Sequence, residues 1–180
     1  MSKILTQNFF NRSALTVAEE LLGKYIVRKV DLPAQAGKKE IALMITEVEA
    51  YDGHADKASH ASKGLTERNK PMFGPAGYFY VYFTYGLHWM FNVVIGPEKY
   101  PAAVLIRGTK DVVGPVRLTK FLKIDKKFNN KKAEPKNGLW FEDRGDKISN
   151  KQISRTSRIG VAYAGPIWSK KKYRFLLKHA

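Results

Sequence analysis

Two glutamates, Glu47 and Glu49, stand one residue apart in the segment EVEAY, at the end of an apolar run. Alternate residues of a β-strand share a face, so we expect one face of this segment to carry Ile41, Leu43, Ile45, Glu47, Glu49 and Tyr51. The three aliphatic side chains indicate that this face is buried, which places the two acids where the core meets an opening. A carboxylate that is partly removed from water at such an opening is suited to general-base chemistry. The alternative is that one or both glutamates form structural ion pairs with arginine or lysine.

A second segment, GYFYVYFTYGLHWMFN, is dense in aromatic side chains. If it forms two strands joined by a tight turn after Tyr85, then Tyr78, Tyr80 and Tyr82 share one face, and the Tyr85 ring is displayed at the end of a hairpin. Aromatic strands most often fill protein cores. Tyrosine also suits a pocket wall, and an exposed ring beside a basic surface can stack on a base or wedge into a nucleic-acid helix.

The elements that must position these residues follow from the hydrophobic pattern, with Gly, Pro and Asn marking the breaks. Ser13 is expected to start a helix that ends at Gly23, and a second helix is expected over residues 114–124. We expect strands at residues 25–30, 40–51, 78–95 (two strands), 101–107, 158–164 and 173–177, and loops at 33–39, 63–77 and 125–137. Many short strands with few helices indicate an α+β fold. We expect a single domain over residues 1–180, with a curved, mostly antiparallel sheet flanked by helices.

Charge narrows the class of partner. The 180-residue chain carries 32 Lys and Arg against 16 Asp and Glu, a formal net charge of +16. The excess is uneven, because residues 1–109 carry 13 basic and 10 acidic side chains and residues 110–180 carry 19 and 6. Lysine and arginine release counterions when they bind phosphates, so this charge favours a nucleic-acid partner. The alternative is a solvated surface without a charged partner.

The chain has no cysteine, which excludes disulfides, a thiolate zinc site and a cysteine nucleophile. That composition is typical of a reducing compartment, and we expect a cytoplasmic protein, associated with the nucleoid if bacterial and nuclear if eukaryotic. No apolar run reaches the length of a membrane span, and the N-terminal segment MSKILTQNFFNRS lacks the long apolar stretch of a secretory signal. We therefore expect no association with a membrane.

Separate motifs occur in a fixed order along the chain: EVEAY, ASHAS, TERNKPMFGPAGYFYVYFTYGLHWMFNVV, AAVLIRG, GPVRLTKFL, SRIGVAYAG and YRF. In this combination the chain resembles the alkyladenine (3-methyladenine) DNA glycosylase family over nearly its full length, from Phe9 to Phe175. The resemblance implies a DNA glycosylase domain that flips alkylated or deaminated purines out of duplex DNA and excises them by hydrolysis, initiating base excision repair. It also implies a monofunctional monomer that needs no metal, no other cofactor and no obligate protein partner.

The resemblance assigns roles around the two glutamates. Glu49, the second acid of EVEAY, matches the general base that activates the attacking water, whereas Glu47 has no catalytic role in that pattern. Arg107 in VLIRG matches a residue that helps to hold this water near the phosphate, and the backbone carbonyl of Ile159 in SRIG is a weaker match for the same task. The alternative for Arg107 is a structural ion pair with Glu47.

A further set of residues matches the family's pocket for the base. Tyr51 and His60 match pocket residues and Tyr82 matches the opposing wall, so that a flipped base would lie between rings. Asn92 matches a residue of the pocket floor that crowds the exocyclic amino group of guanine. Tyr85 matches the residue that inserts into the gap left by the flipped nucleotide.

Other functions remain as alternatives. A non-catalytic nucleic-acid-binding module would explain the charge and the aromatic residues, but it gives no reason for Glu49 beside Tyr51. A base-flipping deaminase needs a zinc site with cysteine ligands, which this chain lacks. A bifunctional lyase would need an active-site lysine as nucleophile, and no lysine has a position in the sequence that suggests this role.

Overall fold

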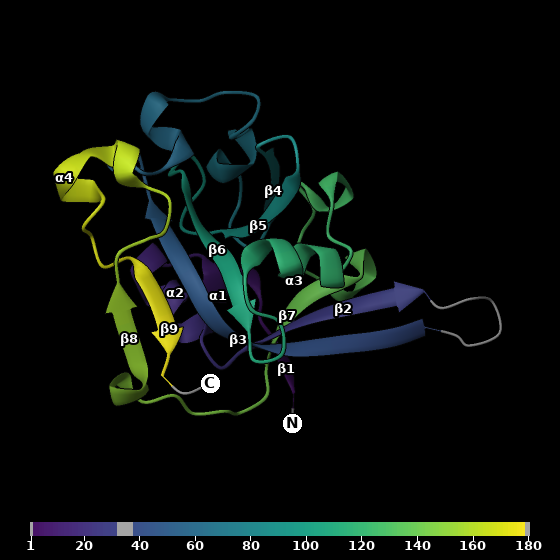
Figure 1. Cartoon of the computed structure of the whole chain (residues 1–180). Coiled ribbons are helices and arrows are strands. Elements are labelled where there is room, and N and C mark those ends of the chain that lie inside the picture. Colours follow the sequence, from purple (N-terminus) through teal and green to yellow (C-terminus); the bar gives the residue numbers. More distant parts are fainter. Residues whose placement is uncertain (1, 32–37, 179–180) are drawn as a thin grey trace.

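The computed structural model describes residues 2–31 and 38–178 of the chain, and Figure 1 shows its strands and helices. Within these residues, nine strands form one antiparallel sheet in the order β1-β7-β2-β3-β6-β5-β4, with β9 pairing with both β3 and β8. The strands are β1 (Lys3–Ile4), β2 (Tyr25–Asp31), β3 (Lys38–Asp52), β4 (Phe79–Thr84), β5 (His88–Val94), β6 (Ala102–Thr109), β7 (Leu139–Asp143), β8 (Ile153–Thr156) and β9 (Arg174–Leu177).

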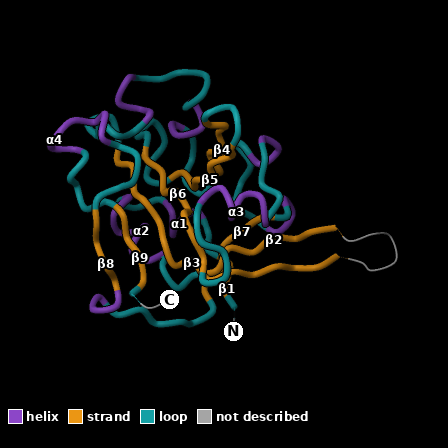
Figure 2. The backbone as a smooth tube through the Cα atoms, viewed as in Figure 1, coloured by secondary structure: helices purple, strands orange, loops and turns teal. Residues whose placement is uncertain are grey.

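Short helices surround this sheet, as Figure 2 shows. The α-helices of the described residues are α1 (Gln7–Phe10), α2 (Ala14–Leu21), α3 (Pro115–Phe121) and α4 (Gly165–Trp168). The 3₁₀-helices are η1 (His60–Lys63), η2 (Lys70–Phe73), η3 (Lys126–Phe128), η4 (Pro135–Asn137), η5 (Asn150–Gln152) and η6 (Ala162–Ala164). Leu21 of α2 and Leu118 of α3 pack into the same core as Val48 of β3. The predicted α+β fold, with its antiparallel sheet and flanking helices, is confirmed.

Helix α2 forms as predicted from its local sequence. Ser13 is the N-cap residue, and the side chains that α2 buries follow helical spacing: Ala14, Val17, Ala18 and Leu21. Gly23 has φ +79°, the left-handed conformation that ends many helices and that glycine adopts without strain. The helix packs against β3 and thereby supports the strand that carries Glu49.

Strand β3 changes its buried face part-way along its length. Ile45 and Val48 are both buried in the core, although residues three apart in an unbroken strand point to opposite faces. The pairing of β3 with β6 is irregular between these residues, which marks a β-bulge. The prediction that one face carries residues 41 to 51 in unbroken alternation is therefore wrong. The bulge turns the face that carries Glu49 away from the core residues Leu43 and Ile45.

The hairpin of β4 and β5 closes through a three-residue loop, Tyr85, Gly86 and Leu87, because Thr84 pairs with His88. The Leu87 N–H donates to the Thr84 carbonyl at 3.1 Å, and the two central residues, Tyr85 and Gly86, have φ +52° and +64°. Positive φ at both positions is typical of a type I′ turn, and Leu87 follows this turn as an extra residue before the first pair of the ladder. The predicted hairpin with its turn after Tyr85 is confirmed, and Tyr85 adopts a conformation that is uncommon for a residue with a side chain.

Other segments differ from the prediction. Residues 158–164 were expected as a strand but form a loop that ends in η6, because Gly160 has φ +75° and breaks the extended conformation. Strands β7 and β8 were not predicted, and the predicted loops 63–77 and 125–137 contain 3₁₀-helices. Most of the loop predicted at 33–39 lies outside the described residues. Among the residues that are described, none of the helices combines the length and the apolar character needed to cross a membrane.

Candidate active site

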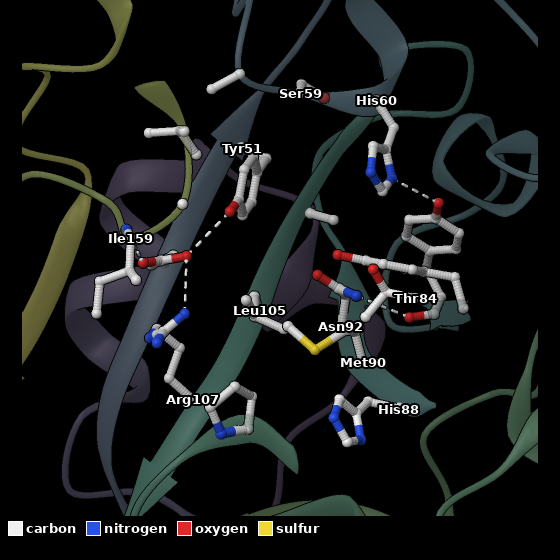
Figure 3. Close-up of a pocket in the computed structure, with 18 of the residues that line it drawn as sticks. Tyr51, Ser59, His60, Thr84, His88, Met90, Asn92, Leu105, Arg107 and Ile159 are labelled. Carbon is white, nitrogen blue, oxygen red and sulfur yellow. Dashed lines mark hydrogen bonds and ion pairs between the residues drawn. The ribbon is translucent and has the colours of Figure 1, made fainter. Parts of the chain in front are cut away.

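A pocket of about 370 Å³ opens where β3, β6, the β4–β5 hairpin and the loop before α4 meet (Figure 3). All eight residues singled out in the sequence line it: Glu49, Tyr51, His60, Tyr82, Tyr85, Asn92, Arg107 and Ile159. The fold thus brings together residues as far apart in the chain as 110 positions. The volume is in the range of small-molecule sites, roughly 300–1,000 Å³.

The Glu49 carboxylate forms part of one wall of this pocket, and the residue is fully buried. Its Oε2 accepts a hydrogen bond from the Tyr51 hydroxyl at 2.9 Å, and its Oε1 accepts one from the Ile159 N–H at 2.8 Å. Figure 3 shows Tyr51, Arg107 and Ile159 converging on one carboxylate from three different segments. Ile159 therefore contacts Glu49 through its N–H, while the role expected for its carbonyl stays a prediction. These contacts hold the carboxylate in one orientation.

Arg107 lies between the two glutamates and contacts both. Its Nε donates to Glu47 Oε1 at 2.9 Å, and its Nη1 lies 3.4 Å from Glu49 Oε2. Arg174 of β9 donates to the same Glu47 oxygen at 2.6 Å. The alternative of an ion pair between Arg107 and Glu47 is therefore confirmed, and it coexists with the contact to Glu49.

A buried ion pair that the sequence analysis missed lies behind this wall. Arg158 donates to both carboxylate oxygens of Asp56, at 2.5 and 2.7 Å, and both side chains are fully buried. Arg158 also donates to the Ala50 carbonyl at 2.8 Å, and its guanidinium lies 4.8 Å from the centre of the Tyr51 ring. The pair fixes the loop that carries Ile159 to the segment after β3. Its members are 102 positions apart, so no local pattern indicates the pair.

The opposite wall is a ladder of cross-strand pairs from β4 and β5. The pairs run from the buried end of the pocket to its mouth: Tyr80 with Asn92, Tyr82 with Met90, and Thr84 with His88. Asn92 Nδ2 donates to the Tyr80 carbonyl at 3.0 Å, which fixes the amide on the floor (Figure 3). His60 Nδ1 lies 2.9 Å from the Tyr80 hydroxyl, and the His60 ring meets the Tyr82 ring edge to face at 4.7 Å.

Burial keeps the rings of the pocket neutral at neutral pH. Burial and the neighbouring Glu49 raise the pKa of Tyr51 well above its usual value, so its hydroxyl stays protonated and donates. Burial raises the pKa of Tyr82 to about 12. Burial, aided by the positive charge of Arg68, lowers the pKa of His60 to about 4. A ligand between these walls therefore meets uncharged aromatic surfaces.

Tyr85 stands at the mouth of the pocket, on the tip of the hairpin. Tyr85 is 88% exposed, the largest value among the exposed large hydrophobic residues of the described chain. The next large side chain of the turn, Leu87, is 69% exposed. The hairpin thus presents apolar groups to the outside beside an aromatic pocket. Within residues 2–31 and 38–178, no group of three or more histidine, aspartate or glutamate side chains is arranged to hold a metal ion.

Comparison with known proteins identifies the family of this chain. The family model for methylpurine-DNA glycosylase (MPG) matches residues 8–113 and 111–180, nearly the whole chain. The chain belongs to the methylpurine-DNA glycosylase family. It is therefore a DNA glycosylase, a hydrolase that cleaves N-glycosidic bonds, and the resemblance drawn from its motifs is confirmed.

Individual relatives of the glycosylase agree with this assignment. A protein of Legionella pneumophila (strain Corby) is 40% identical over 189 residues, covering 97% of this chain and 94% of its own. One of Borreliella burgdorferi (strain ZS7) is 40% identical over 182 residues, covering 94% of each chain. One of Methanocella arvoryzae is 39% identical over 182 residues, covering 90% of this chain and 86% of its own. Each carries the name "Putative 3-methyladenine DNA glycosylase".

Proposed function

We propose that this glycosylase flips an alkylated or deaminated purine of the 3-methyladenine type out of duplex DNA and hydrolyses its N-glycosidic bond. One observation carries the proposal: the buried carboxylate of Glu49 borders an aromatic pocket and is held by the Tyr51 hydroxyl and the Ile159 N–H. A base inside a duplex is out of reach of such a pocket. It must swing out of the helix, which costs a few kcal/mol and least for a damaged pair.

Glu49 is the general base of this mechanism. It takes a proton from the water that attacks C1′ of the deoxyribose, while the purine leaves with the electrons of the N-glycosidic bond. The negative charge of the carboxylate also stabilises the positive charge that develops on the sugar. Arg107, whose Nη1 lies 3.4 Å from Glu49 Oε2, helps to hold the water near the phosphate. The Ile159 carbonyl is the weaker second contact for this water.

The neutral aromatic walls suit a purine that carries positive charge. Alkylation at N3 or N7 makes the base cationic, which improves it as a leaving group and strengthens its contact with aromatic faces. Tyr51, His60 and Tyr82 are the rings that hold the flipped base. Asn92, fixed on the floor by its bond to the Tyr80 carbonyl, disfavours guanine by crowding its exocyclic amino group.

The outer surface of the pocket mouth binds the DNA. Tyr85 inserts into the gap left by the flipped nucleotide, since its ring is exposed at the tip of the hairpin beside the pocket. Exposed lysines such as Lys170, Lys171 and Lys172 contact phosphates and contribute affinity with little sequence preference. We propose that the protein acts as a monomer on double-stranded DNA that contains damaged purines.

We further propose that the enzyme is monofunctional, leaving an abasic site without cutting the strand. A lyase step needs an amine nucleophile next to C1′. Among the described residues, those that line the pocket include no lysine. Water activated by Glu49 is therefore the nucleophile that the pocket supports.

A base-release assay on duplex oligonucleotides with defined lesions tests the proposal, in a buffer with a metal chelator. We expect the wild-type protein to release free alkylpurine and to leave an intact strand with no borohydride-trapped adduct. Glu49→Gln should bind the damaged duplex but release base roughly 100-fold more slowly or worse, because the amide is no base. Glu20→Gln, which alters an exposed ion pair with Arg12, is the control and should keep the wild-type rate.

Normal turnover by Glu49→Gln would show that the mechanism is wrong. Tight lesion binding by the wild-type protein without release of any base would instead support the non-catalytic binding module. A borohydride-trapped adduct would exclude the monofunctional reaction.

A further inference from the structure

Glu47 has no assigned role, yet one oxygen of its carboxylate accepts hydrogen bonds from two arginines beside the pocket. Its Oε1 accepts from Arg107 Nε at 2.9 Å and from Arg174 Nε at 2.6 Å. The three side chains are between 11% and 22% exposed, so water screens them little. Arg174 Nη1 also donates to Thr156 Oγ1 at 3.3 Å, which anchors it to the end of β8. Glu47 thus holds two arginines, of which only Arg107 reaches Glu49.

We propose that Glu47 is a positioning residue that keeps Arg107 from forming a close two-point ion pair with Glu49. Arginine pairs most strongly with a carboxylate through two parallel hydrogen bonds. Here the Nε donor of Arg107 is bound by Glu47, and its Nη1 remains 3.4 Å from Glu49. Glu49 therefore keeps lone pairs for a water instead of giving them to the guanidinium. This inference rests on the proposed role of Glu49 as general base.

The charge balance around Glu49 also indicates that Glu47 helps to keep Glu49 available as a base. Glu47 and Glu49 face Arg107 and Arg174, so the four side chains sum to zero. Removing the charge of Glu47 leaves two cations beside one carboxylate, which stabilises the negative charge of Glu49 and makes it a weaker base. Glu49 also interacts electrostatically with Tyr51 of its own strand, Arg158 of the loop before α4, Tyr82 of β4 and Tyr163 of η6.

Single-turnover base release measured against pH, at saturating protein, tests this role. Glu47→Gln should move the acid limb of the rate profile to lower pH by about one unit, because it removes a negative charge that shares Arg107 with Glu49. Its plateau rate should fall roughly tenfold because the base is weaker, while affinity for the damaged duplex is unchanged. Arg174→Gln removes a cation instead and should move the acid limb to higher pH. Glu20→Gln is the control for loss of an ion pair outside the pocket lining and should leave the profile in place.

The two variants are expected to shift the acid limb in opposite directions. A merely structural role of Glu47 would lower the plateau rate without shifting the acid limb to lower or higher pH. An unmoved limb in folded Glu47→Gln overturns the inference, and so does a shift to higher pH. If Glu47→Gln does not fold, the inference stands on Arg174→Gln, and an unmoved or lowered limb in that variant overturns it. Glu49→Gln measured alongside keeps the two proposals apart. Normal turnover in Glu49→Gln would contradict the proposed function. If Glu49→Gln loses turnover while Glu47→Gln keeps the wild-type pH profile, only the inference about Glu47 is contradicted.

Discussion

Asp56→Ala will destabilise the protein far more than loss of an exposed ion pair, because it leaves a buried cation without its partner. Asp56 accepts from the Asp52 and Ala58 N–H groups, each at 3.1 Å, in addition to its two bonds from Arg158. Removing one partner of a fully buried pair costs about 3–5 kcal/mol of the free energy of unfolding. For a chain of this size, that loss lowers Tm by roughly 6–20 °C.

Thermal and urea unfolding of the wild-type, Asp56→Ala and Glu20→Ala proteins check this prediction. The Arg12–Glu20 pair is the matched control, because its side chains are 37% and 47% exposed and its loss should cost about 0–1 kcal/mol. Below the melting range, Asp56→Ala should also slow base release, since the loop that delivers the Ile159 N–H to Glu49 is held by this pair. Equal loss of stability in the two variants would refute the reasoning.

Tyr85→Ser should weaken capture of a damaged duplex, with little change in the free energy of unfolding, because the ring is 88% exposed and buries almost nothing in the fold. Fluorescence anisotropy with a lesion-containing duplex measures this affinity. An affinity equal to that of the wild type would contradict the proposed insertion of Tyr85 into the helix. His60 has a folded-state pKa of about 4, whereas an unfolded chain titrates near 6.5, so the unfolded state binds a proton first as pH falls. Stability should therefore decline between pH 6.5 and about 4, measured as the urea midpoint. His60→Gln should decline less, and parallel curves for the two proteins would show that His60 does not cause the change.

The elements that short-range signals specify could be predicted from the sequence. Helix α2 begins after Ser13 and ends before Gly23, and the β4–β5 hairpin turns at Tyr85 and Gly86. In each case the signal is the conformational preference of a few adjacent residues. The eight candidate site residues also converge on one pocket, although their sequence motifs specify only their order.

The interactions that depend on distant residues could not be predicted. The bulge in β3 depends on its pairing with β6, so the alternation read from residues 41 to 51 gave the wrong face for Glu49. The contact of Asp56 with Arg158 and that of Glu47 with Arg174 span more than a hundred positions each. Residues 158–164 resemble a strand in composition, but Gly160 has φ +75° and Arg158 pairs with the distant, buried Asp56, so the segment forms a loop.

The loop before α4 is fastened to β3 through the Ala50 carbonyl and the Glu49 carboxylate, and to the next segment through Asp56. The wall that carries Glu49 is thus preorganised by contacts within the protein, which lowers the cost of ordering it when a ligand binds. Under the proposed mechanism, most of the conformational work of recognition is then deformation of the double helix. Relative rates on different lesions should accordingly follow how readily each damaged pair opens, more than how closely each base matches the shape of the slot.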